Sequence, residues 1–300
     1  MKHLIAMSLI LLGLAAPAAR AALNVLTCEP EWAALTQELA GDLANVSSAT
    51  TAQQDPHHIE ARPSLQARAR RADLLICTGA ELETGWLPLL QREAGNARIQ
   101  PGQPGYFEAA RFARLIERPT ALDRAQGDVH ASGNPHLHLD PRNIARVADG
   151  LAKRLADLDP AHAARYADRN ADFQSRWTAA MTRWETQAVG LKGASVVTHH
   201  RNLSYLADWL GLKVIGELEP KPGMEPTASH LAELLETLKA TPARMVLRAA
   251  YESPKAFEWL SSRASIPALE LPYPVGGSPG AKDLFGLFDD TLSRLLQAAP

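Results

Sequence analysis

Residues 23–94 carry the pattern that decides the fold: LNVLTCEPEWAALTQELAGDLANVSSATTAQQDPHHIEARPSLQARARRADLLICTGAELETGWLPLLQREA. Short apolar runs in this stretch predict three β-strands, at Leu23–Cys28, Val46–Thr51 and Asp73–Cys77. The segments that separate and follow these strands have helical patterns, at Glu31–Leu43, Pro63–Arg71 and Leu82–Ala94. Strands that alternate with helices in this way predict a parallel sheet covered by helices.

The same alternation restarts after Gly190. Four further strands are predicted at residues 194–198, 213–217, 244–249 and 268–272. The helices predicted between and after them are Leu203–Leu210, Thr227–Leu238, Pro254–Ser262 and Lys282–Leu296. The chain is therefore expected to use one α/β architecture twice, although the two halves show no clear sequence repeat.

Two helices are predicted between these halves, at 141–157 and 160–189, separated by Asp159-Pro160. Large apolar residues in the second helix recur seven, four, four and three positions apart: Tyr166, Phe173, Trp177, Met181 and Trp184. Such a stripe is typical of a helix that faces a core. We therefore expect residues 22–159 to form an N-terminal lobe, 160–189 a long rigid connecting helix, and 190–300 a C-terminal lobe.

The beginning of the chain resembles an export signal. Lys2 precedes the apolar run Leu4–Ala16, and Ala19-Arg20-Ala21 matches an A-x-A cleavage site, so we expect cleavage after Ala21. The apolar run is shorter than the roughly 20 residues that a membrane span needs. Cys28 lies too far beyond the expected cut to be the lipidated first residue of a lipoprotein. These features predict a soluble periplasmic protein, if the source is Gram-negative.

Overall charge excludes one class of partner. The formal net charge is −2, and the sequence has no basic patch, so nothing indicates binding to nucleic acid. The 300 residues and the 46% hydrophobic content are those of an ordinary globular protein of about two domains.

Cys28 and Cys77 are the two cysteines of the chain, and each ends a predicted strand. If these strands are neighbours in one sheet, the cysteines can form a disulfide in an oxidising compartment. Two buried thiols are the alternative. Ligation of zinc by the thiolates is disfavoured, because neither cysteine belongs to a C-x-x-C motif.

Six of the ten histidines fall into three pairs: His57/His58, His136/His138 and His199/His200. Neutral imidazole is the commonest protein ligand for zinc. Ligands of open parallel sheets bind beyond the carboxyl ends of the strands, which is where the first and third pairs lie. The second pair precedes the connecting region and can face the same cleft between lobes. Three unrelated surface pairs are the alternative interpretation.

The sequences around these pairs support a common site. DPHHIEARPS (55–64), NPHLHLDP (134–141) and THHRNLSYLADWLGL (198–212) occur in this order along the chain. They resemble the metal-specific solute-binding proteins of ABC importers, the zinc- and manganese-binding periplasmic class. That family carries the segments D-P-H-x-Y-E-P-T-P, D-P-H-x-W-L-D-P and H-x-A-F-x-Y, each of which contributes a histidine ligand. The resemblance covers essentially the whole mature chain.

The resemblance implies one metal ligand in each pair. The matching positions are His57, His136 and His200, the last of which lies five residues before Tyr205. The other members are then expected to donate or accept hydrogen bonds around the site, or to bind metal transiently: His58, His138 and His199. His130, which precedes the second motif, resembles the His-bearing loops of some zinc-specific members, although a lone exposed histidine often has no function.

A fourth ligand is not evident. The family usually supplies Asp or Glu from the second lobe, but Arg248 stands at one such position, and PVGGSPG (274–280) follows the last predicted strand. Glu60, Glu252, Asp283 and water are the candidates, and each of these acids could equally be a solvated charge or a helix cap.

The motifs therefore predict periplasmic capture of a transition metal ion and its delivery to an inner-membrane ABC permease, by a monomer without catalytic activity. Three imidazoles favour Zn²⁺ over Mn²⁺, which prefers oxygen ligands. An exported zinc hydrolase is an alternative, because three histidines and a water also make a catalytic zinc site. However, the sequence has no H-E-x-x-H motif and no obvious general base beyond Glu60. A periplasmic zinc metallochaperone would have the same site.

Overall fold

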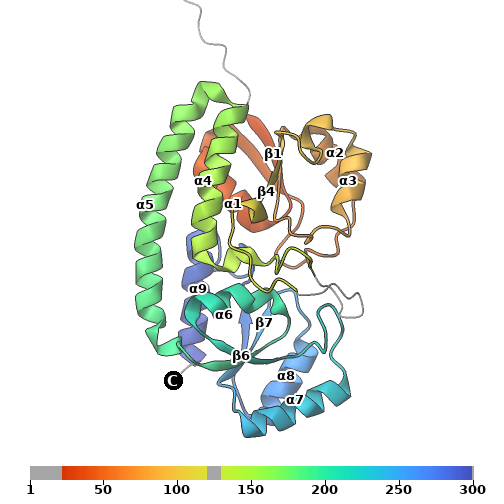
Figure 1. Cartoon of the computed structure of the whole chain (residues 1–300), viewed down its shortest axis with the longest axis vertical. Helices are drawn as coiled ribbons and strands as arrows, with labels where there is room; N and C mark the ends of the chain where they lie inside the picture. Colours follow the sequence, from red (N-terminus) through yellow and green to blue (C-terminus); the bar gives the residue numbers. More distant parts are fainter. Residues whose placement is uncertain (1–21, 120–129, 299–300) are drawn as a thin grey trace, which may run out of the picture.

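The computed structural model describes residues 22–119 and 130–298, so the cleavage expected after Ala21 lies outside the described residues. These residues contain two parallel four-stranded sheets (Figure 1). The first has the order β2-β1-β3-β4: β1 is Leu23–Thr27, β2 is Ala44–Ser48, β3 is Leu74–Cys77 and β4 is Tyr106–Glu108. The second has the order β6-β5-β7-β8: β5 is Ser195–Thr198, β6 is Lys213–Glu217, β7 is Met245–Ala249 and β8 is Ala268–Leu271. The prediction of two parallel α/β lobes is confirmed.

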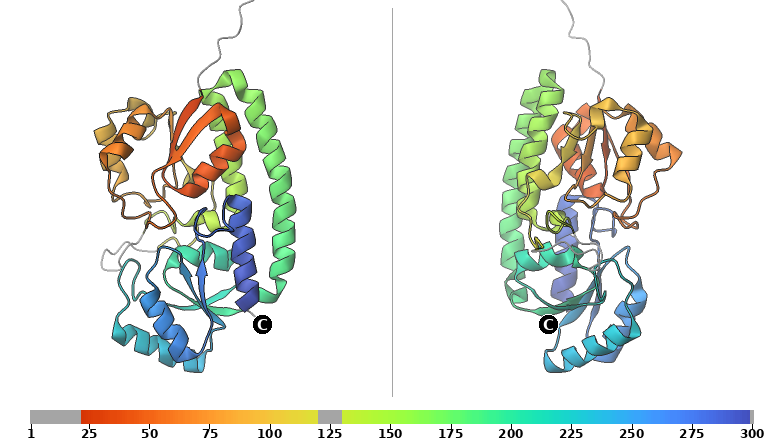
Figure 2. Two further views of the ribbon diagram at one scale, coloured as in Figure 1. Left: turned by 180° about the vertical axis from the view of Figure 1, so that it is seen from behind. Right: turned by 45° about the vertical axis from the view of Figure 1, so that its right-hand side comes forward.

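Helices flank both sheets (Figures 1 and 2). In chain order they are α1 (Pro30–Ala40), α2 (Pro63–Arg71), α3 (Leu87–Ala94), α4 (Pro141–Leu158), α5 (Ala163–Gln187), α6 (Ser204–Leu210), α7 (Ala228–Ala240), α8 (Pro254–Ala264) and α9 (Leu284–Ala298). Over the described ranges, none of these helices has both the length and the apolar character of a membrane span.

Several elements of the first lobe differ from the sequence prediction. Strand β2 is Ala44–Ser48 rather than Val46–Thr51, and α1 ends at Ala40 rather than Leu43. Helix α3 begins at Leu87 rather than Leu82, because the chain first turns at Ala80 and Glu81, which both have positive φ angles. The carboxylate of Glu83 stabilises this turn by accepting the backbone N–H groups of Thr78 and Gly79. Strand β4 was not predicted, because three residues are too few to show a periodic pattern.

Helix α5 connects the lobes and runs beside both of them (Figure 2). Four residues of its apolar stripe are buried and Met181 is partly buried, in a core cluster that continues from strand β1 to helix α9. Trp177 packs on Phe285 of α9 with ring centroids 4.9 Å apart, and Trp184 packs on Phe288 at the same distance. Both indoles also donate hydrogen bonds, Trp177 to the carbonyl of Pro141 and Trp184 to a carboxylate of α9. One continuous core and satisfied polar groups make this helix a rigid link.

Cys28 and Cys77 form a disulfide between the neighbouring strands β1 and β3. Their Cα atoms are 4.8 Å apart, and neither residue is exposed. Of the two alternatives that the sequence left open, the structure therefore has the disulfide, and it lies inside a small apolar cluster of the first lobe.

We predict that replacing Cys28 and Cys77 together by alanine lowers the free energy of unfolding. The disulfide closes a loop with a sequence separation of 49 residues, and chain entropy assigns such a loop about 4 kcal/mol. Urea unfolding of the oxidised protein and of the double variant measures the difference. A dithiol reductant should lower the free energy of unfolding of the parent protein by a similar amount. A difference below about 1 kcal/mol between the parent and the double variant would mean that the disulfide adds little stability.

Candidate metal centre

Three histidines that are far apart in the sequence meet between the two lobes. One ring nitrogen each from His57, His136 and His200 lies within 4.8 Å of the other two. The ring centroids are 5.1 Å apart for His57 and His136, 5.3 Å for His136 and His200, and 5.9 Å for His57 and His200. All three residues are buried. The first two come from loops of the first lobe, and His200 follows strand β5 of the second.

Each of these imidazoles has a hydrogen-bond partner at Nδ1. Asp55 Oδ1 lies 2.7 Å from Nδ1 of His57, and Glu219 Oε2 lies 2.7 Å from Nδ1 of His200. For His136 the partner is the hydroxyl of Tyr273, at 2.6 Å. A carboxylate accepts a hydrogen bond from Nδ1–H, and this proton leaves the lone pair of the neutral ring on Nε2.

The remaining nitrogens are those that a cation would use. Nε2 of His57 and Nε2 of His136 are buried and have no hydrogen-bond partner within residues 22–119 and 130–298. A buried polar atom without a partner is unfavourable unless it binds something. Imidazole nitrogens that converge from three segments form a donor set suited to Zn²⁺ and similar transition metals.

Two of the histidines are oriented by the same local turn. Asp55 Oδ1 accepts the backbone N–H of His57 at 2.9 Å, and Asn134 Oδ1 accepts that of His136 at 2.9 Å. In both cases an Asx side chain, a proline and the histidine form an Asx-type turn, which the proline helps to fix. The motifs D-P-H and N-P-H therefore encode the backbone geometry of two histidines.

The third histidine is placed by the sheet. Strand β5 pairs in parallel with β6, and the register brings Thr198 opposite Glu217. His200 and Glu219 each lie two residues further on, beyond the same carboxyl edge, where their side chains meet. This is the edge at which open parallel sheets bind ligands.

The other members of the three pairs lie outside this cluster of ring nitrogens. His58 is exposed. His138 is buried, with Nδ1 3.2 Å from Glu31 Oε1 and Nε2 3.0 Å from the carbonyl oxygen of Tyr273. His199 is also buried, and its Nε2 lies 4.0 Å from Glu219 Oε1. The structure thus brings together the three histidines that the motifs singled out.

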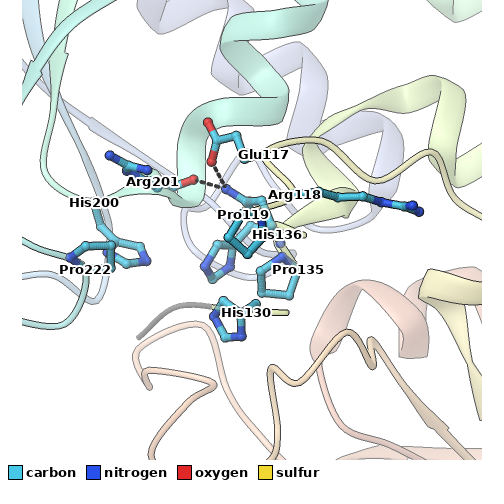
Figure 3. A pocket seen from close by; sticks show the side chains of 10 residues that line it. Glu117, Arg118, Pro119, His130, Pro135, His136, His200, Arg201 and Pro222 are labelled. Atoms are coloured by element: carbon cyan, nitrogen blue, oxygen red, sulfur yellow. Dashed lines mark hydrogen bonds between the residues drawn. The ribbon is translucent and has the colours of Figure 1, made fainter. Parts of the chain in front are cut away.

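His130 lies beside the cluster. Its ring stacks on that of His57 with centroids 5.5 Å apart, and its centroid is 6.4 Å from that of His136. Figure 3 shows the rings of His130, His136 and His200 around one cavity, which has a volume of 330 Å³.

A second cavity, of 200 Å³, is also lined by His57 and His200. Among the described residues its lining has no lysine or arginine and four carboxylates: Asp55, Glu219, Glu225 and Glu252. A cavity of this composition attracts cations toward the histidines.

The three acids considered as fourth ligands have other contacts. The side chain of Glu60 is 82% exposed and lies 3.5 Å from Arg62 Nε. Asp283 is exposed and accepts the backbone N–H of Gly286 at 2.8 Å. Glu252 is buried, but one carboxylate oxygen accepts the N–H of Ala249 and the other accepts the side-chain amide of Asn202. None of these three belongs to the histidine cluster.

The residues behind the histidines were not predicted from the sequence: Asp55, Glu219 and Tyr273. Asp55 could have been found, because it opens the D-P-H motif. Glu219 required the pairing of β5 with β6, and no local pattern distinguishes it from other acids of the second lobe. Tyr273 could not have been found, because it follows strand β8 in a left-handed conformation, with φ 58°, that is unusual for a residue other than glycine.

Burial sets the protonation of this region. The pKa of His136 lies well below its ordinary value, first because the ring is buried and then because other histidines surround it. This imidazole is therefore neutral at physiological pH, as a metal ligand must be. Burial also raises the pKa of Glu252 to about 7.

Comparisons with known proteins identify the class to which this fold and site belong. Residues 25–298 match the family model of ZnuA, described as zinc-uptake complex component A periplasmic. The chain therefore belongs to the ZnuA family of substrate-binding proteins.

Two of the relatives carry zinc in their names. The chain is 28% identical to the high-affinity zinc uptake system protein ZnuA of Paracoccus denitrificans, over 96% of this chain and 94% of that protein. It is 27% identical to the zinc-binding lipoprotein AdcA of Streptococcus pneumoniae strain R6, over 72% of this chain. The chain spans less than half the length of AdcA, 43%.

Solved structures share the fold. A crystal structure of ZnuA superposes with a TM-score of 0.75 at 22% identity, over 93% of this chain and all of the other. A Mn-bound periplasmic metal binding protein from Candidatus Liberibacter asiaticus gives a TM-score of 0.74 at 17% identity, over 92% of this chain and 99% of the other.

We predict that Glu252→Gln alters the pH dependence of stability in the metal-free protein. The pKa of Glu252 is about 7 in the folded state and about 4.3 when the chain is unfolded. Because the pKa is higher in the folded state than in the unfolded state, the contribution of this carboxyl to the free energy of unfolding is fully present below pH 4.3. It is lost as the pH rises to 7. The free energy of unfolding of the parent should therefore fall by about 3 kcal/mol relative to that of the variant between these pH values.

Urea unfolding at pH 4.5 and pH 7.5 measures this difference. Glu60→Gln is the matched control, because it makes the same change at an exposed position outside the histidine cluster. If the difference in free energy of unfolding between the parent and Glu252→Gln is the same at both pH values, the prediction is wrong.

Proposed function

We propose that this protein captures a transition metal ion, Zn²⁺ in preference to Mn²⁺, between its two lobes and delivers it to an ABC permease of the inner membrane. One observation carries the proposal: three buried imidazoles, each held at Nδ1, have ring nitrogens within 4.8 Å of one another. His57, His136 and His200 are the proposed ligands. Membership of the ZnuA family supports the proposal.

The donor set supports zinc. All three proposed ligands are nitrogen donors, and Mn²⁺ prefers more oxygen ligands than this site offers. We infer that the fourth position takes water, because Glu60, Glu252 and Asp283 all have other contacts. Relatives of the chain differ in cargo: one is a zinc-binding lipoprotein, and another is named for manganese transport. The cargo of this chain is therefore inferred from its own proposed ligands.

The carboxylates around the site support transport over hydrolysis. A hydrolytic zinc site needs a carboxylate or histidine free to take a proton from the bound water. Asp55 and Glu219 instead face the Nδ1 atoms of two histidines, and Glu252 is hydrogen-bonded at both oxygens. The proposed location is the periplasm, in agreement with the family description and the export signal expected at residues 1–21. We propose that the protein acts as a monomer.

We predict that alanine at His57, His136 or His200 weakens zinc binding by about 100-fold or more, because each variant removes one of three protein ligands. Competition with a zinc-chelating dye measures the affinity, and metal analysis of the purified protein measures the stoichiometry. His58→Ala is the matched control, because it removes the exposed neighbour of one ligand and should bind zinc as the parent does. A variant of His57 that binds zinc as tightly as the parent would remove it from the ligand set.

We predict that the zinc-loaded protein stimulates ATP hydrolysis by its permease complex reconstituted in liposomes, and that zinc enters the lumen. His136→Ala, which lacks a proposed ligand, should support neither process. A protein that binds zinc but never stimulates the permease, and instead transfers the ion to an apo-enzyme, would be a metallochaperone. Ester or phosphate hydrolysis that a chelator abolishes would establish the hydrolase alternative.

A further inference from the structure

Tyr273 connects the second lobe to a histidine of the first. It follows strand β8, and its side chain is buried. Its hydroxyl lies 2.6 Å from Nδ1 of His136, while its carbonyl oxygen lies 3.0 Å from Nε2 of His138. The rings of Tyr273 and His138 also pack edge to face, with centroids 4.8 Å apart. One residue of the second lobe thus holds both histidines of the N-P-H-L-H segment.

This arrangement differs from that of the other two proposed ligands. His57 receives its partner from Asp55, two residues earlier, and His200 from Glu219 of its own lobe. Of these three histidines, His136 is the one whose Nδ1 partner comes from the opposite lobe. Its partner is also a neutral phenol, which can be buried without the desolvation penalty of a carboxylate.

The phenol of Tyr273 is not positioned as a ligand. It contacts Nδ1 of His136, whereas the nitrogen that has no partner among the described residues is Nε2, on the other side of the ring. When a metal occupies Nε2, the ring proton is on Nδ1 and is donated to the tyrosine oxygen. In the metal-free protein the hydroxyl can donate to Nδ1 instead. The same pair of atoms therefore stays hydrogen-bonded in both states, with donor and acceptor exchanged.

The backbone of Tyr273 indicates that this position is maintained against strain. Its φ of 58° is in the left-handed region, which is unfavourable for a residue with a bulky side chain. The contacts with His136 and His138 favour this conformation. Strain of this kind commonly accompanies function, so the conformation supports a role in the site.

We propose that Tyr273 is a positioning residue that sets the zinc affinity through His136 and makes it depend on the contact between the lobes. The inference rests on the proposed function and goes beyond it. While the lobes are in contact, the phenol fixes the orientation of His136 and can accept the Nδ1 proton when Nε2 binds the metal. A separation of the lobes, such as a permease could impose, withdraws this partner and weakens one of the three metal bonds. Release of zinc is thereby coupled to opening of the protein.

The test is Tyr273→Phe, which removes the hydroxyl and keeps the ring. We expect zinc affinity to fall by about 10- to 100-fold, mainly through faster dissociation in stopped-flow chelator competition. Tyr251→Phe is the matched control: its ring packs on Tyr273 at 5.5 Å, but its hydroxyl accepts a hydrogen bond from Asn202. We expect this variant to bind zinc within about twofold of the parent, since the hydrogen bond of its hydroxyl is with Asn202 and not with a proposed ligand.

Two further measurements separate positioning from packing. In a double-mutant cycle, Tyr273→Phe should cause no further loss of zinc affinity when His136 is already alanine. When His57 is alanine instead, Tyr273→Phe should lower the affinity by the same factor as in the parent. In ¹⁵N NMR spectra of the zinc-loaded protein, Tyr273→Phe should shift the Nδ1 resonance of His136 and leave that of His200 in place. Unfolding by urea checks that the variant is folded.

Each outcome decides the inference. The inference would be overturned if Tyr273→Phe bound zinc as tightly as the parent. It would also be overturned if Tyr273→Phe lowered zinc affinity by the same factor in the His136→Ala background as in the parent. This failure differs from failure of the proposed function: in that case His136→Ala itself would leave zinc binding unchanged.

Discussion

A buried imidazole has two ring nitrogens, and both need partners. At His57, His136 and His200, Nδ1 is within 2.7 Å of an oxygen of the protein, and one ring nitrogen of each lies within 4.8 Å of the other two. Among the described residues, Nε2 of His57 and Nε2 of His136 are buried without a hydrogen-bond partner. The rest of the architecture places the three rings and their hydrogen-bond partners. The two lobes must stay close enough for rings from three segments to meet, and the residues behind the rings must hold their orientation.

The scaffold meets this requirement through one continuous core. Helix α5 packs against elements of both lobes, with Trp177 edge to face against Phe285 of α9 and Trp184 stacked on Phe288. Close packing of large rings resists small displacements, because a shift of either lobe would open voids. The disulfide between β1 and β3 adds a covalent constraint in the first lobe. A stiff frame of this kind suits modest motions of the lobes about a site that both of them complete.

The distribution of charge is consistent with a binding protein. The acidic residues near the histidines are used to orient imidazoles and to stabilise loops, as Asp55, Glu219 and Glu252 illustrate. Arg248, which stands where the family often has a carboxylate, donates hydrogen bonds to the carbonyl oxygens of Ala249 and Glu252 and forms an ion pair with Glu270. It therefore stabilises the turn after β7. The proposed ligands of the cargo, His57, His136 and His200, are nitrogen donors.

Sequence alone determined the α/β alternation, the buried face of the connecting helix, and the histidine of each pair that joins the cluster. These features are encoded locally, by hydrophobic period and, for His57 and His136, by Asx-Pro-His turns whose geometry depends on neighbouring residues. His200 was singled out by the resemblance of the motif around it. Only the tertiary structure decided that Cys28 pairs with Cys77, that Glu219 lies behind His200, and that Tyr273 crosses from the second lobe to His136. These contacts join residues 49, 19 and 137 positions apart. Their geometry arises from strand pairing and lobe packing, which no local pattern of residues specifies.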